Sequence, residues 1–244
     1  MNNFSIQPNI NCFYIPDLTS DLINLPEEES RHAVKSLRMR MNDNLLLTNG
    51  NGTMAEAIIV EINSKGTIIK VSQRYQLPKP MYELHIVLSP LQHADRLEWF
   101  IEKAVEMGVQ QITPVICQRT ENKKINMERL SKISIAALKQ SRQAYLPVIN
   151  PVTSFADFIK NNTFVNKGIC VCMGHRSTLK QWLDTSTENR FVVLIGPEGD
   201  FTQEEIELAL SYQYAPLSLG NSTLRSETAA LFVASGIKIN FLQQ

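Results

Sequence analysis

The sequence predicts an α/β protein with a small β-rich domain over residues 1–76 and a larger domain built on a parallel sheet over residues 77–244. Three observations support this prediction. Short β-type runs separated by turn residues fill the N-terminal third, apolar runs alternate with helical segments in the remainder, and the proline-punctuated stretch QLPKPMYE lies between them. Alternation of strands and helices favours a parallel sheet covered by helices, and short strands joined by turns favour a small barrel.

The N-terminal domain is expected to contain four β-type runs, CFYI, NLLLTNGNGT, AEAIIVEI and GTIIKV. The dipeptides Asn49-Gly50 and Asn51-Gly52 lie between two of these runs, and both tolerate the positive φ angles of a tight hairpin. One helix fits this region, starting near Pro26 and running through EEESRHAVKSLRM. Proline in a first turn and glutamates near the positive end of the helix dipole support that start.

The C-terminal domain is expected to contain the strands ELHIVL, ITPVIC, GICVCM, FVVLI and APLSL. Apolar residues at helical spacing predict a helix over DRLEWFIEKAVEMG, with Gly108 as its C-cap. A second helix, MERLSKISIAALKQSRQAY, has apolar and basic residues on opposite sides. A third follows Phe201, with Thr202 and Glu205 as a capping box. The apolar run ETAALFVASGIKINF predicts a buried final helix.

Composition excludes several classes of protein. Of the 244 residues, 43% are hydrophobic and 20% charged, which is ordinary for a globular protein. The formal net charge of zero argues against indiscriminate coating of nucleic acid but leaves local basic patches open. No apolar run approaches the roughly 18 residues needed to cross a bilayer, and the first residues lack the layout of a secretion signal. We therefore expect a cytoplasmic protein that does not contact a membrane.

The four cysteines are scattered through apolar runs, which indicates reduced core thiols. A zinc site needs about four ligands, and no metal site is expected.

Glycines cluster at one edge of the predicted sheet. Of ten glycines in the chain, Gly174, Gly196, Gly199 and Gly220 fall in three loops that follow predicted strands. Ligands of open α/β sheets bind in such loops, beyond the carboxyl ends of the strands, so a ligand cleft is expected there. The Gly-Lys-Ser/Thr ending of a Walker loop and the G-x-G-x-x-G of a dinucleotide fold are both absent from the sequence.

Two segments, LIGPEGDFTQEEIELA and LSLGNSTLRSETAALFVAS, resemble the two signature motifs of the RsmE family. The similarity extends through DRLEWFIEKAVEMGVQQITPV, KQSRQAYLPVINP and HAVKSLRMRMND followed by NGNG, and so covers nearly the whole chain. The resemblance implies methylation of N3 of a uridine in 16S ribosomal RNA, or in the small subunit, with S-adenosylmethionine as donor. It also implies a homodimer, a PUA-like RNA-binding β-barrel at the N-terminus, and a C-terminal SPOUT-type α/β domain with a trefoil knot.

The same resemblance implies a set of donor-binding residues in the three glycine-containing loops. These are Met173, Gly174, Ile195, Gly196, Pro197, Glu198, Gly199, Leu219, Gly220 and Leu224. The chain departs from the usual family pattern at three positions: Asn42 and Asp200 stand where glycine is usual, and Ser222 where a basic residue is common.

Arg225 and Glu198 are the candidate catalytic residues. A guanidinium at Arg225 can bind phosphate or stabilise negative charge on the uracil oxygens, and the alternative is a structural salt bridge with Glu227 or Glu198. Glu198 can attract the sulfonium or accept the N3 proton, and the alternative is a carboxylate that caps backbone amides in its turn.

Five basic residues are candidate RNA contacts. Arg31, Lys35 and Arg38 are spaced to share one helix face, which could contact successive phosphates, or could be an ordinary solvated surface. The other two are Arg40 and Arg142. Two rivals to the enzyme interpretation stay open: a non-catalytic RNA-binding protein of the same fold, and a methyltransferase that acts on another RNA.

Overall fold

The computed structural model describes residues 10–242, which form two compact units. Of the described residues, unit 1 comprises 10–79 together with Ile135–Leu146, and unit 2 comprises Pro80–Ser134 and 147–242. Within residues 10–242 no helix combines the length and the apolar character needed to cross a bilayer.

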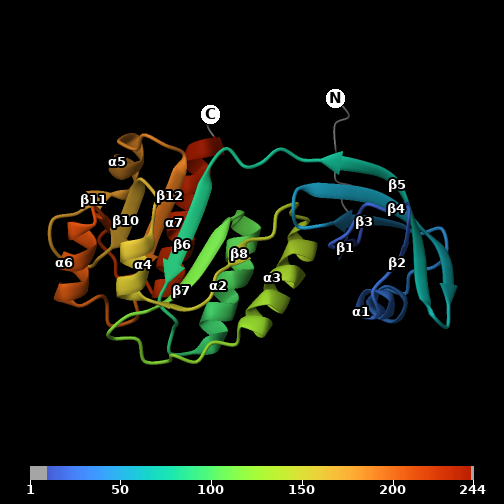
Figure 1. The fold of residues 1–244 in the computed structure, drawn as a ribbon, viewed down its shortest axis with the longest axis horizontal. Helices are drawn as coiled ribbons and strands as arrows, with labels where there is room; N and C mark the ends of the chain where they lie inside the picture. Colours follow the sequence, from blue (N-terminus) through green and yellow to red (C-terminus); the bar gives the residue numbers. More distant parts are fainter. Residues whose placement is uncertain (1–9, 243–244) are drawn as a thin grey trace. The chain divides into compact units, whose positions relative to one another are not determined.

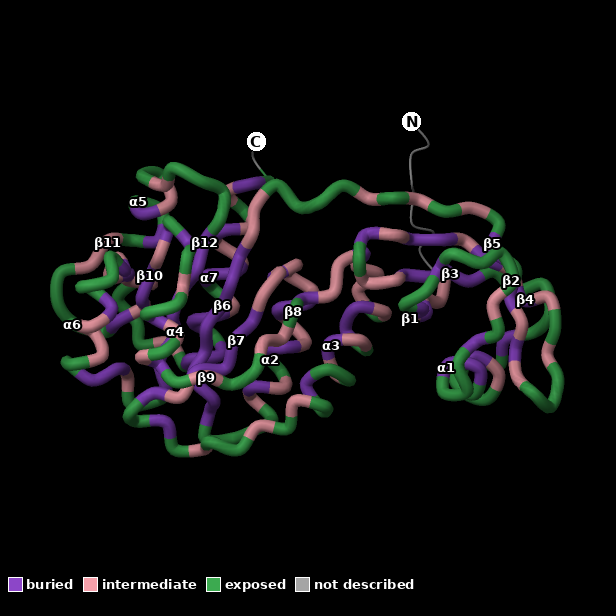
Figure 2. Tube along the Cα trace, viewed as in Figure 1, coloured by how far each residue is buried: buried purple, intermediate pink, exposed green. Residues whose placement is uncertain are grey.

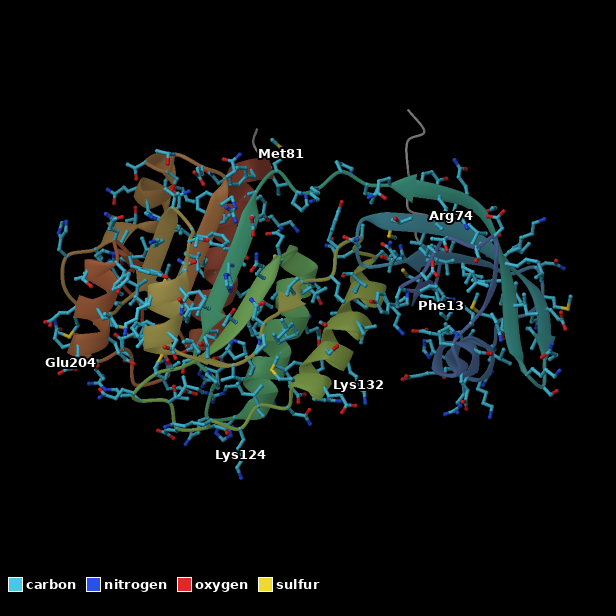
Figure 3. The ribbon with its side chains drawn as sticks, in the orientation of Figure 1. Phe13, Arg74, Met81, Lys124, Lys132 and Glu204 are labelled. Atoms are coloured by element: carbon cyan, nitrogen blue, oxygen red, sulfur yellow. The ribbon has the colours of Figure 1, made fainter. Side chains whose placement is uncertain are left out.

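Unit 1 contains a five-stranded sheet in the order β1-β3-β4-β5-β2 (Figure 1). Its elements are β1 (Cys12–Tyr14), β2 (Leu22–Asn24), α1 (Glu27–Arg31), the π-helical turn η1 (His32–Ser36), β3 (Asn44–Thr48), β4 (Thr53–Asn63) and β5 (Gly66–Gln76). The Asn-Gly-Asn-Gly stretch joins β3 to β4 as an antiparallel hairpin, as predicted. Phe13, labelled in Figure 3, is fully buried in the core of this unit.

The segment Ile135–Leu146 packs on this hairpin turn. The Gly52 amide donates to the Ala144 carbonyl at 2.8 Å, and the Leu146 amide donates to the Gly50 carbonyl at 2.8 Å. A side chain built on Gly52, whose φ is +91°, would collide with the Tyr145 hydroxyl. Two stretches far apart in the sequence, NGNG and RQAYLP, therefore meet through backbone hydrogen bonds that need glycine.

Unit 2 is built on an eight-stranded sheet in which every pairing is parallel, and the predicted parallel sheet is confirmed. The strand order is β11-β13-β10-β12-β6-β7-β8, with β9 paired to β7. The strands are β6 (Glu83–Leu88), β7 (Gln111–Ile116), β8 (Val148–Ile149), β9 (Thr153–Ser154), β10 (Asn166–Cys170), β11 (Ser177–Thr178), β12 (Arg190–Ile195) and β13 (Ala215–Ser218). The helices are α2 (Ala94–Met107), α3 (Met127–Ser141, which ends in unit 1), α4 (Phe155–Asn161), α5 (Leu179–Asp184), α6 (Gln203–Ser211) and α7 (Ser226–Leu242).

Helices cover both faces of this sheet, because its central strands are apolar on both sides. On β12, Phe191, Val193 and Ile195 pack with α2, α5 and α7, whereas Val192 and Leu194 pack with α4 and α6. Figure 2 shows the buried residues concentrated along β6, β10 and β12. The final helix α7 has eight buried positions along its length, as its apolar sequence predicts.

His85 on β6 faces the α4 side of the sheet and is 5% exposed. Its ring is 2.7 Å from the Thr113 hydroxyl and packs against Phe158 and Phe164. Burial lowers the pKa of His85 to about 4, and the nearby Glu83 opposes this only partly.

This buried imidazole predicts a loss of stability in acid. Because the unfolded chain binds a proton at His85 below pH 6.5 and the folded chain does so only near pH 4, stability falls as the pH drops through this window. Between pH 7 and pH 5, this difference in proton binding at His85 lowers the free energy of unfolding by about 2 kcal/mol. Urea unfolding of the wild type and of His85→Gln at pH 7 and pH 5 measures it. The variant should lose less free energy of unfolding than the wild type over that interval, and an equal loss would contradict the prediction.

Candidate active site

Three loops at the carboxyl edge of the parallel sheet form the candidate site. They follow the neighbouring strands β13, β10 and β12, and the register aligns Cys170 with both Ile195 and Leu217. The three strands therefore end at the same level, and the loops leave the sheet side by side. Ligands of parallel sheets bind in loops at this carboxyl edge.

A cavity of about 430 Å³ lies between these loops and the first turn of α7. Apolar walls come from the strand ends and from the loop after β13, and charged groups come from Arg176, Glu198, Asp200 and Arg225. Seven of the ten predicted donor-binding residues line it, namely Ile195, Gly196, Pro197, Glu198, Leu219, Gly220 and Leu224. The other three, Met173, Gly174 and Gly199, are not among the described residues that line the cavity, and Met173 is 84% exposed.

In the Gly-Pro-Glu-Gly turn, Gly196 is closely packed within the protein, whereas Gly199 has room for a small side chain. A side chain on Gly196 would lie 3.1 Å from the Phe201 ring, and one on Gly199 would lie 3.4 Å from Arg119. Neither glycine has a positive φ. Arg119 in turn donates to the Gly199 carbonyl at 2.7 Å, which fixes the shape of the turn.

Glu198 points toward the loop that follows β6. Its Oε1 accepts a hydrogen bond from the Gln92 amide at 3.0 Å and lies 3.9 Å from Arg96. The Arg96 guanidinium is also 4.0 Å from Glu227, whose side chain is 9% exposed. Glu198 therefore bonds an amide of a neighbouring loop, and Arg96 lies within ion-pair distance of both carboxylates.

Arg225 lines the cavity and is exposed to solvent. Within residues 10–242 its side chain makes no hydrogen bond or ion pair, so neither Glu198 nor Glu227 holds it in a salt bridge. The guanidinium, which is always charged, is therefore available to an anionic or carbonyl group of a ligand.

Several lining residues were not predicted from the sequence: Cys170, Val171, Cys172, Arg176, Asp200, Leu217, Asn221, Ser222, Thr223, Ser226 and Ala229. Most of them lie in the loops that follow β10, β12 and β13, so the same rule that selected the glycines applies to them. Burial raises the pKa of the Cys170 thiol, and partial burial together with Asp200 raises that of Cys172. Both shifts favour the neutral thiol over the thiolate.

All five predicted RNA contacts lie in unit 1, whereas the loops that line the cavity belong to unit 2. The structure corrects the expectation that Arg31, Lys35 and Arg38 share one helix face. The helix passes into a π turn after Arg31 and ends at Ser36, and Arg38 has a left-handed φ of 54° while Met39 turns into the core. A π turn changes the angular spacing of side chains, so a rule based on 3.6 residues per turn fails there. Arg31 also pairs with Glu27 at 2.6 Å.

Comparison with known protein families decides the class of this protein. Residues 78–238 match the model of an RNA methyltransferase domain, and residues 25–72 match that of an RNA methyltransferase PUA domain. The chain belongs to this family of RNA methyltransferases. The two matched segments carry the C-terminal sheet with its cavity and most of the N-terminal sheet.

Individual relatives of this family agree along nearly the full chain. The ribosomal RNA small subunit methyltransferase E of Rickettsia conorii is 29% identical over 89% of each chain. A probable rRNA methyltransferase from Porphyromonas gingivalis is 32% identical, with a TM-score of 0.86 over 96% of this chain and 99% of that one. A methyltransferase from Legionella pneumophila, solved with bound SAM, is 27% identical, with a TM-score of 0.84 over 95% and 98%. The resemblance to the RsmE family is confirmed, and the protein is an RNA methyltransferase.

Proposed function

We propose that this methyltransferase uses S-adenosylmethionine to methylate N3 of a uridine in 16S ribosomal RNA, as a cytoplasmic homodimer. The single observation that carries the proposal is the cavity of about 430 Å³ between the loops that contain the two RsmE-like motifs. Its volume falls in the range of about 300 to 1,000 Å³ that is typical of pockets for ligands of this size. The relatives named for the small ribosomal subunit support the choice of RNA.

The residues that line the cavity fit a cationic, partly apolar donor. Ile195, Leu219 and Leu224 offer apolar walls, and the carboxylates of Glu198 and Asp200 offer negative charge for a sulfonium. A bound S-adenosylmethionine would supply an electrophilic methyl carbon, which a deprotonated uridine N3 can attack. The protein then needs to position the base and remove one proton.

Arg225 and Glu198 are proposed for these tasks. Arg225 carries a charged guanidinium on the cavity wall and can stabilise the negative charge that spreads to the uracil oxygens when N3 loses its proton. Glu198 is the acidic group held in place by the Gln92 amide and by Arg96, and its carboxylate is the proposed acceptor of the N3 proton.

Two further parts of the proposal, RNA contact and pairing of two copies, concern residues exposed on the protein surface. The exposed basic residues of unit 1 are proposed to contact RNA phosphates together with Arg142; they are Arg31, Lys35, Arg38 and Arg40.

On α7, Phe232, Ile239 and Leu242 are 49%, 54% and 73% exposed and lie at helical spacing on one side. An apolar stripe of this kind supports pairing of two copies through the final helix.

Mass spectrometry of 16S ribosomal RNA tests the proposed reaction. RNA from a strain that lacks this protein should have lost methylation at N3 of one uridine, and purified protein with S-adenosylmethionine should restore it on isolated small subunits. Persistence of the modification in that strain would contradict the proposed substrate. Transfer to another RNA, or donor binding with no transfer, would favour the two rival functions.

A further inference from the structure

Asp200 ends the Gly-Pro-Glu-Gly turn in a backbone conformation that most residues avoid. Its φ is 61°, in the left-handed region, and its amide donates to the Pro197 carbonyl at 3.0 Å. A residue with a Cβ is disfavoured there, whereas glycine adopts the conformation freely. The presence of an aspartate at this position therefore points to a contribution from its side chain.

The Asp200 carboxylate makes two hydrogen bonds to backbone amides. Oδ1 accepts from the Phe201 amide at 2.8 Å and so holds the chain just before the N-cap of α6. Oδ2 accepts from the Cys172 amide at 3.1 Å. The second bond joins the turn after β12 to the loop after β10, and both Asp200 and Cys172 line the cavity.

The loop it holds, residues 171–176, has little packing of its own near its middle. Arg176 closes its base by donating to the Val171 carbonyl at 3.0 Å. Further out, Met173 is 84% exposed, and no heavy atom lies within 4 Å of where a side chain on Gly174 would begin. A loop with few buried contacts opens easily unless a specific bond restrains it.

We propose that Asp200 is a positioning residue. Its hydrogen bond from the Cys172 amide, which we call the Asp200 clasp, holds the 171–176 loop against the turn after β12 and so fixes the walls of the donor cavity before the donor binds. The identity of the donor rests on the proposed function, but the fastening itself does not. Because a preformed cavity avoids the entropy of ordering a loop on binding, the Asp200 clasp raises donor affinity.

Hydrogen exchange of the ligand-free protein tests the clasp directly. In Asp200→Gly, which suits the left-handed backbone but lacks the carboxylate, amides of residues 171–176 should exchange at least about tenfold faster, since a charged hydrogen bond is lost. The Asp200→Asn variant keeps one acceptor oxygen and should show a smaller increase. Unchanged exchange of this loop in Asp200→Gly would overturn the proposal.

Calorimetric titration with S-adenosylmethionine tests the consequence for binding. Asp200→Gly should bind about tenfold more weakly than the wild type, with Asp200→Asn between them. Gln213→Gly is the matched control, because Gln213 also has a left-handed φ, of 66°, in unit 2 but does not line the cavity. This control should leave loop exchange and donor affinity unchanged.

The two measurements separate the clasp from the proposed function. A wild-type protein that fails to bind S-adenosylmethionine would contradict the donor assignment and leave the exchange result valid. Normal donor affinity in Asp200→Gly, or equal losses in Asp200→Gly and Gln213→Gly, would overturn the clasp alone.

Discussion

The Arg225→Ala variant is expected to transfer methyl groups about 100- to 1,000-fold more slowly than the wild type, which is the effect of removing one charge-stabilising donor from an active site. Arg225 lines the cavity, is exposed, and makes no ion pair within residues 10–242. Arg96 instead lies beside the two carboxylates nearby. Single-turnover methylation of isolated small subunits measures the rate, and calorimetry should show donor affinity within about threefold of wild type.

Two further variants identify what the guanidinium does. Arg225→Lys keeps the charge but loses the planar fork, so it should recover part of the rate if charge alone matters and little if two-point contact is required. Arg129→Ala removes an exposed arginine of α3 that pairs with Glu98 away from the cavity, and it should leave the rate unchanged. A parallel loss of donor affinity in Arg225→Ala would assign this residue to donor binding instead.

Strand and helix patterns predicted unit 2 well because its sheet is buried on both faces. The run FVVLI is apolar at every position and ELHIVL at all but Glu83 and His85, and the structure places both in the centre of the sheet. The capping box at Thr202 and Glu205 and the left-handed C-cap at Gly108 were also predicted from local chemistry and are confirmed. These features depend on neighbouring residues, which sequence displays directly.

Contacts between distant segments could not be predicted in the same way. The amphipathic pattern of α3 identifies a helix, but it does not show that the segment from Ile135 onward packs on the hairpin turn at Gly50 and Gly52. The π turn at His32–Ser36 is likewise hidden, because its sequence is an acceptable α-helix. The trefoil knot stays a prediction of the family resemblance.

The location of the cavity was predicted from the sequence, but the contact between two of its loops was not, again because it joins distant segments. Glycines after parallel strands led to the edge of the sheet where the cavity lies, yet neither Gly196 nor Gly199 has an unusual backbone, and only Gly196 is tightly packed, against Phe201. The unusual backbone lies next to them, at Asp200, where sequence reasoning saw only a departure from the expected glycine. A side chain that bonds across two loops is visible only when both loops are placed.

Glu198→Gln is expected to slow methyl transfer by about 100-fold or more, because general base catalysis typically contributes that much. Glutamine keeps a carbonyl oxygen that can accept the Gln92 amide, so the turn should retain its position while the proton acceptor is lost. The loss of negative charge beside the cavity should also weaken donor binding severalfold. Single-turnover rates together with calorimetry separate the two effects.

Glu227→Gln is the matched control, because Glu227 lies at a similar distance from Arg96 but is not among the cavity-lining residues. Its Oε2 is buried and has no hydrogen-bond partner among the described residues. Since an unpaired charged oxygen is costly to bury, replacing it with an amide should keep or raise the free energy of unfolding and leave the transfer rate near wild type. If Glu227→Gln instead slows transfer as much as Glu198→Gln, the two carboxylates act through the placement of Arg96, and Glu198 is not the proton acceptor.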